Sequence, residues 1–139
     1  MLRRMGEAEA VLFANEAFYR AFTARDVEAM DEIWARHCPI ACIHPGWGAL
    51  EGRPTVMQSW RGIMGNAASP KIRPRAAKAY LLGEAAYVIC FEEIDGQFLL
   101  ATNVFVREDG RWRLVHHQAG PTNDAPPAEA DDEAKRVVN

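Results

Sequence analysis

The chain has 139 residues, 49% of them hydrophobic and 25% charged, and a net charge of -3. This length and balance are typical of one soluble globular domain that needs no disulfide bond or structural metal to fold. The absence of a basic run excludes a typical nucleic-acid-binding surface, and no apolar run approaches the roughly 18 residues of a membrane span. Three cysteines, an odd number, indicate a reducing compartment, so we expect a cytoplasmic protein that binds neither nucleic acid nor membranes.

The first third of the sequence predicts two helices. Between residues 11 and 22, apolar side chains recur every three or four residues, which indicates one amphipathic helix. Asn15 is the polar exception within its apolar stripe. Asp26 is a suitable N-cap for a second helix, whose apolar face holds Val27, Met30, Ile33 and Trp34. The short joint between the two predicts that they fold back on one another.

A short strand and a third helix are expected next. Residues 40–44 are β-prone and are followed by a Pro-Gly pair, which predicts a short strand that ends in a turn. The third helix is expected from about Gly52 to Met64. Pro54 fits its first turn, because the backbone N–H that proline lacks has no partner there.

The rest of the body predicts antiparallel strands joined by tight turns. Asp95-Gly96 and Asp109-Gly110 are each flanked by β-prone residues, which is the strongest short-range signal of a hairpin. Gly83-Glu84 is a weaker third turn, after a strand within residues 72–82. This pattern favours one curved sheet after the helices.

The end of the sequence differs from the body in composition. Residues 124–139 are rich in proline, alanine and acidic side chains, with only Val137 and Val138 as large apolar residues. Such a segment has little apolar area to bury. We therefore predict a single domain over residues 1–123, followed by a flexible tail over residues 124–139.

The two hairpin turns also predict which side chains share a face of the sheet. With Asp109 and Gly110 as the turn residues, Asn103 lies opposite His116. The same reasoning at Asp95-Gly96 extends this face across a third strand. The predicted inner face then carries a polar strip, which consists of Cys90, Glu92, Asn103, His116 and Gln118.

The opposite face of the predicted sheet is apolar. It carries Tyr87, Ile89, Phe91, Leu100, Val104 and Val115. A contiguous apolar patch is rarely left open to water on a monomer. A second copy of the protein is the simplest cover, so we predict a two-fold homodimer through this outer face.

Three stretches of the sequence resemble a known family. They are NEAFYRAF at residues 15–22, CIHPGW at residues 42–47 and GRWRLVHHQ at residues 110–118. With the order helix, helix, short strand, helix and long strands, residues 7–120 resemble the SnoaL-like branch of the nuclear transport factor 2-like (NTF2-like) superfamily.

The resemblance implies a fold but leaves the activity open. It implies an α+β protein in which a cone-shaped, curved antiparallel sheet wraps around the N-terminal helices (an NTF2-like or cystatin-like α+β barrel). It also implies a pocket between sheet and helices, and commonly a sheet-to-sheet dimer. Members include isomerases, cyclases, dehydratases and proteins that only bind, so the fold does not choose among them.

His116 is the leading candidate for chemistry. An imidazole that is hydrogen-bonded to Asn103 could move a proton near neutral pH, and the alternative is a satisfied core histidine. His44, Trp47 and Trp60 are expected at the wall or mouth of the pocket, with core packing as the alternative. His117 is assigned to the opposite face, as an interface or packing residue.

Glu92 is the only acidic residue on the predicted pocket face. A buried carboxyl there would serve as a general acid or base, but the nearby Asp95-Gly96 turn favours a solvated position at the rim. The isomerase- and cyclase-type members use an aspartate in the pocket, and no aspartate here matches it. A metal site is not expected, because Cys38 and Cys42 would lie about 13 Å apart along a strand.

The sequence therefore favours a pocket protein that binds a small, largely apolar molecule, without chemistry and without a cofactor. Its expected ligand contacts are Asn15, His44, Trp47, Trp60, Cys90, Glu92 and Gln118. The alternative is a lyase or isomerase, of the cyclase or dehydratase type, in which His116 and Asn103 transfer a proton while Gln118 or Asn15 holds a substrate oxygen. A third hypothesis is a domain whose only role is dimerisation.

Overall fold

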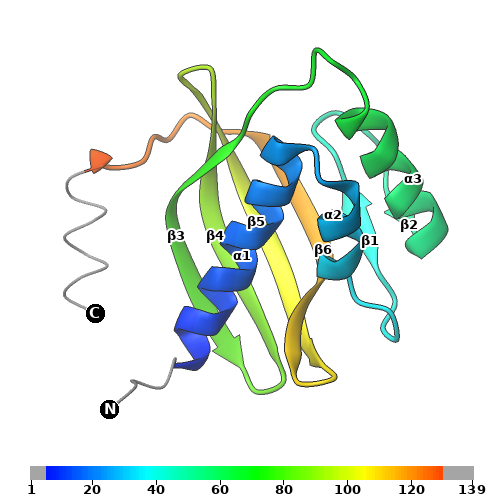
Figure 1. Ribbon diagram of the computed structural model, residues 1–139. Helices are drawn as coiled ribbons and strands as arrows, with labels where there is room; N and C mark the ends of the chain where they lie inside the picture. Colours follow the sequence, from blue (N-terminus) through cyan, green and yellow to red (C-terminus); the bar gives the residue numbers. More distant parts are fainter. Residues whose placement is uncertain (1–5, 130–139) are drawn as a thin grey trace.

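The computed structural model describes residues 6–129, in which helices pack against one curved sheet (Figure 1). The sheet has six strands in the order β2-β1-β6-β5-β4-β3. The helices are α1 (Glu7–Ala24), α2 (Val27–Ile33) and α3 (Arg53–Met64). The strands are β1 (Ala41–Ile43), β2 (Leu50–Glu51), β3 (Arg73–Leu82), β4 (Ala85–Ile94), β5 (Gln97–Glu108) and β6 (Arg111–Pro121). The predicted α+β fold is confirmed.

Helix α1 lies across the concave face of the sheet, with α2 and α3 beside it toward β6 and β1 (Figure 1). Its predicted apolar stripe is buried, and it includes Asn15 and Tyr19. The helix ends where Arg25 takes a left-handed conformation, and Asp26 then caps α2 by accepting a hydrogen bond from the Ala29 N–H at 3.0 Å. The side chains between these helices and the sheet form the core, and Trp34 and Trp60 belong to it.

Both Asp-Gly turns form as predicted. Asp95 and Gly96 have φ angles of 50° and 77°, and Asp109 and Gly110 have φ angles of 54° and 75°. Two-residue hairpin turns of this type need a positive φ at both positions, which Asp-Gly accepts more readily than most pairs. The turn at Asp95-Gly96 sets the β4–β5 register as expected, with Val88 opposite Asn103.

The predicted β5–β6 register is confirmed only from the turn as far as Phe105 opposite Leu114. Beyond that pair Val104 lies opposite His116, so Val115 is an extra residue that forms a β-bulge. The prediction that Asn103 faces His116 is therefore wrong, and Asn103 faces His117 instead.

The bulge moves a second predicted pocket residue. Ala101 lies opposite Ala119, so Gln118 points to the outer face and is exposed. Since side chains alternate along a strand, one inserted residue reverses the faces of all that follow. The sheet is also not wholly antiparallel as predicted, because β1 runs parallel to β6, with Ala41 opposite His116.

The outer face carries the predicted apolar side chains, and in the single chain they are half-buried or exposed. Ile89 and Leu100 are each 37% exposed. No helix within residues 6–129 is long and apolar enough to cross a membrane.

The described part of the predicted tail touches β3 at two points. The Pro127 carbonyl accepts a hydrogen bond from Arg75 at 2.7 Å, and the Glu129 carboxylate pairs with Arg73. Residues 130–139, which include Val137 and Val138, lie outside the described residues. The flexibility of the tail stays a prediction.

Deleting residues 124–139 should lower the melting temperature by no more than about 8 °C, because the two contacts seen from its described part, at Pro127 and Glu129, contribute about 2 kcal/mol or less together. Differential scanning calorimetry of the full chain and the truncated chain measures this. A drop of 15 °C would contradict the prediction and would mean that the tail is part of the folded domain.

Candidate functional site

A pocket of about 230 Å³ lies between α1, α3 and the sheet, near the ends of β4 and β6. Its polar lining groups are His44, Glu92 and His117. The remaining lining residues are apolar, namely Phe22, Pro45, Trp47, Trp60, Ile63, Pro70, Ile72, Ile94 and Leu99. Of the predicted ligand contacts, His44, Trp47, Trp60 and Glu92 line it. The pocket is thus an apolar hollow with a small set of polar groups, as small-molecule sites commonly are.

Glu92 is buried rather than placed at the rim, so the expectation of a solvated carboxyl is wrong. It follows Val88 and Cys90 on the inward side of β4, and only 2% of its surface is exposed. The Tyr19 hydroxyl on α1 donates a hydrogen bond to Glu92 Oε2 at 2.8 Å. The acid is covered because α1 crosses the sheet in front of it.

Asn103 connects this acid to a histidine through a chain of hydrogen bonds. Its Nδ2 group donates to Asn15 Oδ1 at 2.8 Å and to the Tyr19 hydroxyl oxygen at 3.0 Å. Both amide hydrogens are then in use, so Asn103 Oδ1 accepts the bond from His117 Nδ1 at 2.5 Å. His117 therefore carries its proton on Nδ1, and its Nε2 is free to accept one.

The unprotonated Nε2 of His117 lies 3.7 Å from Glu92 Oε2. Burial raises the pKa of Glu92 to about 7, with the Tyr19 hydrogen bond opposing the rise. Burial also lowers the pKa of His117 to about 3 and that of His44 to about 4. Near neutral pH the pocket holds two uncharged imidazoles beside a carboxyl that is close to half ionised. Such an arrangement can donate a proton and accept one.

Two further predicted contacts are not among the residues that line the pocket. Asn15 and Cys90 are both buried, and Asn15 Nδ2 lies 3.9 Å from Cys90 Sγ. Cys90 also contacts the Tyr19 hydroxyl at 3.4 Å. Burial raises the pKa of Cys90 to about 12, so it stays a thiol at neutral pH.

The structure separates His116 from this group. Its Nδ1 lies 3.0 Å from the Ala41 carbonyl on the neighbouring strand β1. His117, expected on the opposite face, is the inward histidine and is only 3% exposed. Tyr19 was missed because it reads as one more apolar residue of the α1 stripe. Its position one helical turn after Asn15 was the available signal.

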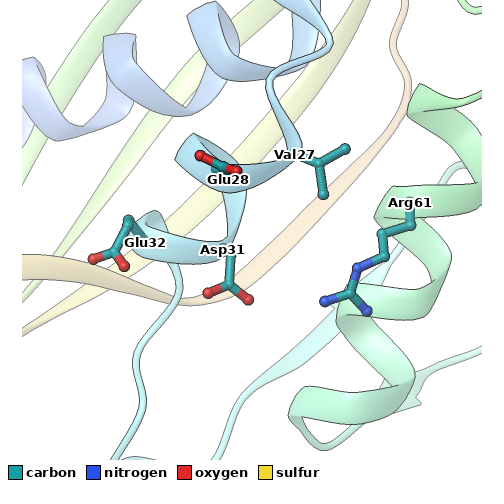
Figure 2. Close-up of a pocket in the computed structure, with 5 residues that line it drawn as sticks. All are labelled: Val27, Glu28, Asp31, Glu32 and Arg61. Carbon is teal, nitrogen blue, oxygen red and sulfur yellow. The ribbon is translucent and has the colours of Figure 1, made fainter.

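A second hollow on the surface has no comparable chemistry. It lies between α2 and α3, where Asp31 and Arg61 face one another (Figure 2). Asp31 is already paired with Arg36 at 2.8 Å and with Arg53 at 2.9 Å, and these partners lower its pKa. The groups around this hollow are therefore typical of a solvated, ion-paired surface.

Within residues 6–129, one group of side chains has the composition of a metal site. It consists of His37, Glu108 and Asp109, whose ligand atoms lie within 4.8 Å of one another. However, the two Glu108 oxygens accept hydrogen bonds from the backbone N–H groups of Arg36 and His37, both at 2.8 Å. The Glu108 side chain therefore links the loop at Arg36 and His37 to β5, which accounts for its position without a metal ion.

Comparisons with known proteins agree with this fold. Residues 11–123 match the SnoaL-like domain family. A solved structure of a proposed dehydratase of the NTF2-like family from Streptomyces avermitilis is 32% identical, with a TM-score of 0.77, and the match covers 85% of this chain and 97% of that one. A proposed calcium/calmodulin-dependent protein kinase type II association domain from Thiobacillus denitrificans is 35% identical, with a TM-score of 0.71, over 79% of this chain and 93% of that one.

One curated relative is also similar, the F-box protein SKIP8 of Arabidopsis thaliana. It is 28% identical over 112 residues, which are 79% of this chain. The chain spans about half the length of that relative, 48%.

Glu92→Gln should raise the free energy of unfolding at pH 8 by about 3 kcal/mol and leave it nearly unchanged at pH 4. The folded protein holds the Glu92 proton up to a pH of about 7, whereas the unfolded chain releases it near 4.5. The wild type therefore loses stability as the pH rises through this window, and glutamine removes the loss. Urea unfolding curves at both pH values measure the difference.

Glu93→Gln is the matched control for this experiment. The Glu93 carboxylate is paired with Arg73 at 3.1 Å and Arg75 at 3.0 Å, and these arginines lower its pKa. Its loss should give no gain at pH 8. Equal stability of Glu92→Gln and the wild type at pH 8 would show that Glu92 is not held in its neutral form.

Proposed function

Since the chain belongs to the SnoaL-like domain family, we propose that it binds a small, largely apolar molecule in its pocket and transfers a proton to or from it through Glu92. The observation that carries this proposal is a buried carboxyl that lines an apolar pocket and has a pKa near 7. A general acid or base works best when its pKa lies near the operating pH. Lyase and isomerase chemistry, as in dehydration or double-bond migration, needs such a group.

Each neighbour of Glu92 has a role in this mechanism. Tyr19 positions the carboxyl by donating to Oε2, which leaves Oε1 to carry the proton of the neutral acid. His117 Nε2 lies beside the carboxyl as an uncharged hydrogen-bond acceptor, and Asn103 keeps it in that form by holding the proton on Nδ1. Dehydration of an alcohol would use Glu92 twice: its carboxylate takes the proton from the carbon next to the C–O bond, and the carboxyl then gives that proton to the departing hydroxyl as the C–O bond breaks.

The homodimer is a second proposal, separate from the proton transfer. The apolar outer face supports it, and so does the 35% identity to a solved structure described as an association domain. The bulge adds His116 to this face, between half-buried apolar side chains. We propose that a second copy of the chain covers it.

Glu92→Gln should slow proton transfer at least about 100-fold, because a positioned general acid or base typically contributes a factor of 10²–10⁴. One test does not need the natural substrate to be known. Small cyclic ketones such as 2-cyclohexenone exchange their α-protons for deuterium in D₂O, and proton NMR measures the rate. The wild type and the Glu93→Gln control should accelerate exchange, and Glu92→Gln should not. Equal rates for the wild type and Glu92→Gln would favour a pocket that binds without chemistry.

Leu100→Lys should convert the dimer to a monomer, because it places a charge in the centre of the apolar outer face. Sedimentation velocity at micromolar concentration measures the mass. Phe13→Lys is the control, since Phe13 is 62% exposed on α1, outside the predicted interface. A wild type that sediments as a monomer would overturn the dimer proposal.

A further inference from the structure

Glu92 differs from the other well-packed carboxylates in having no cationic partner. Asp31 and Glu93 each pair with two arginines, and Glu108 accepts two backbone N–H groups beside Arg113. Within residues 6–129, the hydrogen bond that Glu92 accepts comes from the neutral hydroxyl of Tyr19. His117 is close, but its burial keeps it uncharged. When Glu92 ionises, the Tyr19 hydroxyl stabilises its charge, but no positive charge of the described residues is paired with it.

The walls around this carboxylate are suited to a positive charge. Three aromatic rings line the pocket, those of Phe22, Trp47 and Trp60, and among the described residues no lysine or arginine does. The face of an aromatic ring attracts cations, most strongly in tryptophan, and the attraction grows when water is excluded. An anionic ligand would meet a like charge, with no lysine or arginine among the described lining residues to offset it.

We propose that the ionised pocket binds a small organic cation, an amine or a quaternary ammonium ion, with Glu92 as its counter-ion and the rings of Trp47, Trp60 and Phe22 as its contacts. This inference goes beyond the proposed proton transfer and does not depend on it. A neutral ligand would leave the carboxylate unpaired, whereas a cation supplies the missing partner. The same chemistry predicts that such a cation competes with a neutral substrate for the pocket.

The pH dependence of binding isolates Glu92. The titratable groups that face it are Tyr19 from α1, Cys42 from β1, Cys90 from β4, His117 from β6 and His44. Burial raises the pKa of Tyr19 and raises the pKa of each cysteine to about 12, while the two histidines titrate at about 3 and 4. Between pH 5.5 and 8.5, Glu92 is therefore the group in this set that changes charge.

Choline and its neutral isostere 3,3-dimethylbutan-1-ol provide a direct test, because they share a shape and differ in charge. Binding to the full chain is measured by isothermal titration calorimetry at pH 5.5 and 8.5. The affinity for choline should rise roughly 30-fold between these values, because a carboxyl with a pKa of about 7 is only about 3% ionised at pH 5.5. The affinity for the isostere should stay level or fall.

Glu92→Gln should bind both compounds equally at pH 8.5, and Glu93→Gln should behave as the wild type. The proposal is overturned if the wild type binds the isostere as tightly as choline at pH 8.5, if it binds neither compound, or if the choline affinity does not change with pH. The pH series uses the wild type alone, so it tests the proposal even if Glu92→Gln folds poorly. Proton exchange in ketones is measured separately, so either proposal can fail without the other.

Discussion

The buried amide of Asn103 is the interaction on which the geometry of the site depends, because it joins three separate elements. Its nitrogen donates to Asn15 and Tyr19 on α1, and its oxygen accepts from His117 on β6. A fully buried polar group is stable only when its hydrogen bonds are made. One side chain therefore fixes how α1 lies on the sheet, where the Tyr19 hydroxyl meets Glu92, and which nitrogen of His117 is free.

The bulge at Val115 determines which of two adjacent histidines this amide meets. Leu114 and His117 both point inward although three positions separate them, and an unbroken strand would have turned His116 inward instead. The same bulge brings His116 to the Ala41 carbonyl of β1. A single extra residue thus places one histidine beside the acid and leaves the other at the junction of two strands.

The sequence predicted what depends on local chemistry and missed what depends on distant contacts. The helical periodicity, the Asp26 cap and the two Asp-Gly turns each depend on residues that are close together in the chain. All of them formed as expected. The β4–β5 register followed from its turn. The bulge has no local signature here, because Val115 is as β-prone as its neighbours. The prediction for Glu92 failed for a similar reason. Its position near a turn indicated an exposed carboxyl, but α1, which lies more than 70 positions earlier in the chain, covers the side chain.

Placing an unpaired carboxyl in the pocket has an energetic consequence for the whole protein. The pKa of Glu92 is about 7 in the folded protein and near 4.5 in the unfolded chain. This difference lowers the stability of the protein without ligand at neutral pH and above. Ligands that bind only the folded state restore stability in proportion to their concentration and affinity. The neutral carboxyl is a proton donor, and the ionised one is a proton acceptor that also attracts cations. Because one oxygen pair serves all three purposes, a ligand that pairs with the carboxylate necessarily removes the base that proton transfer requires.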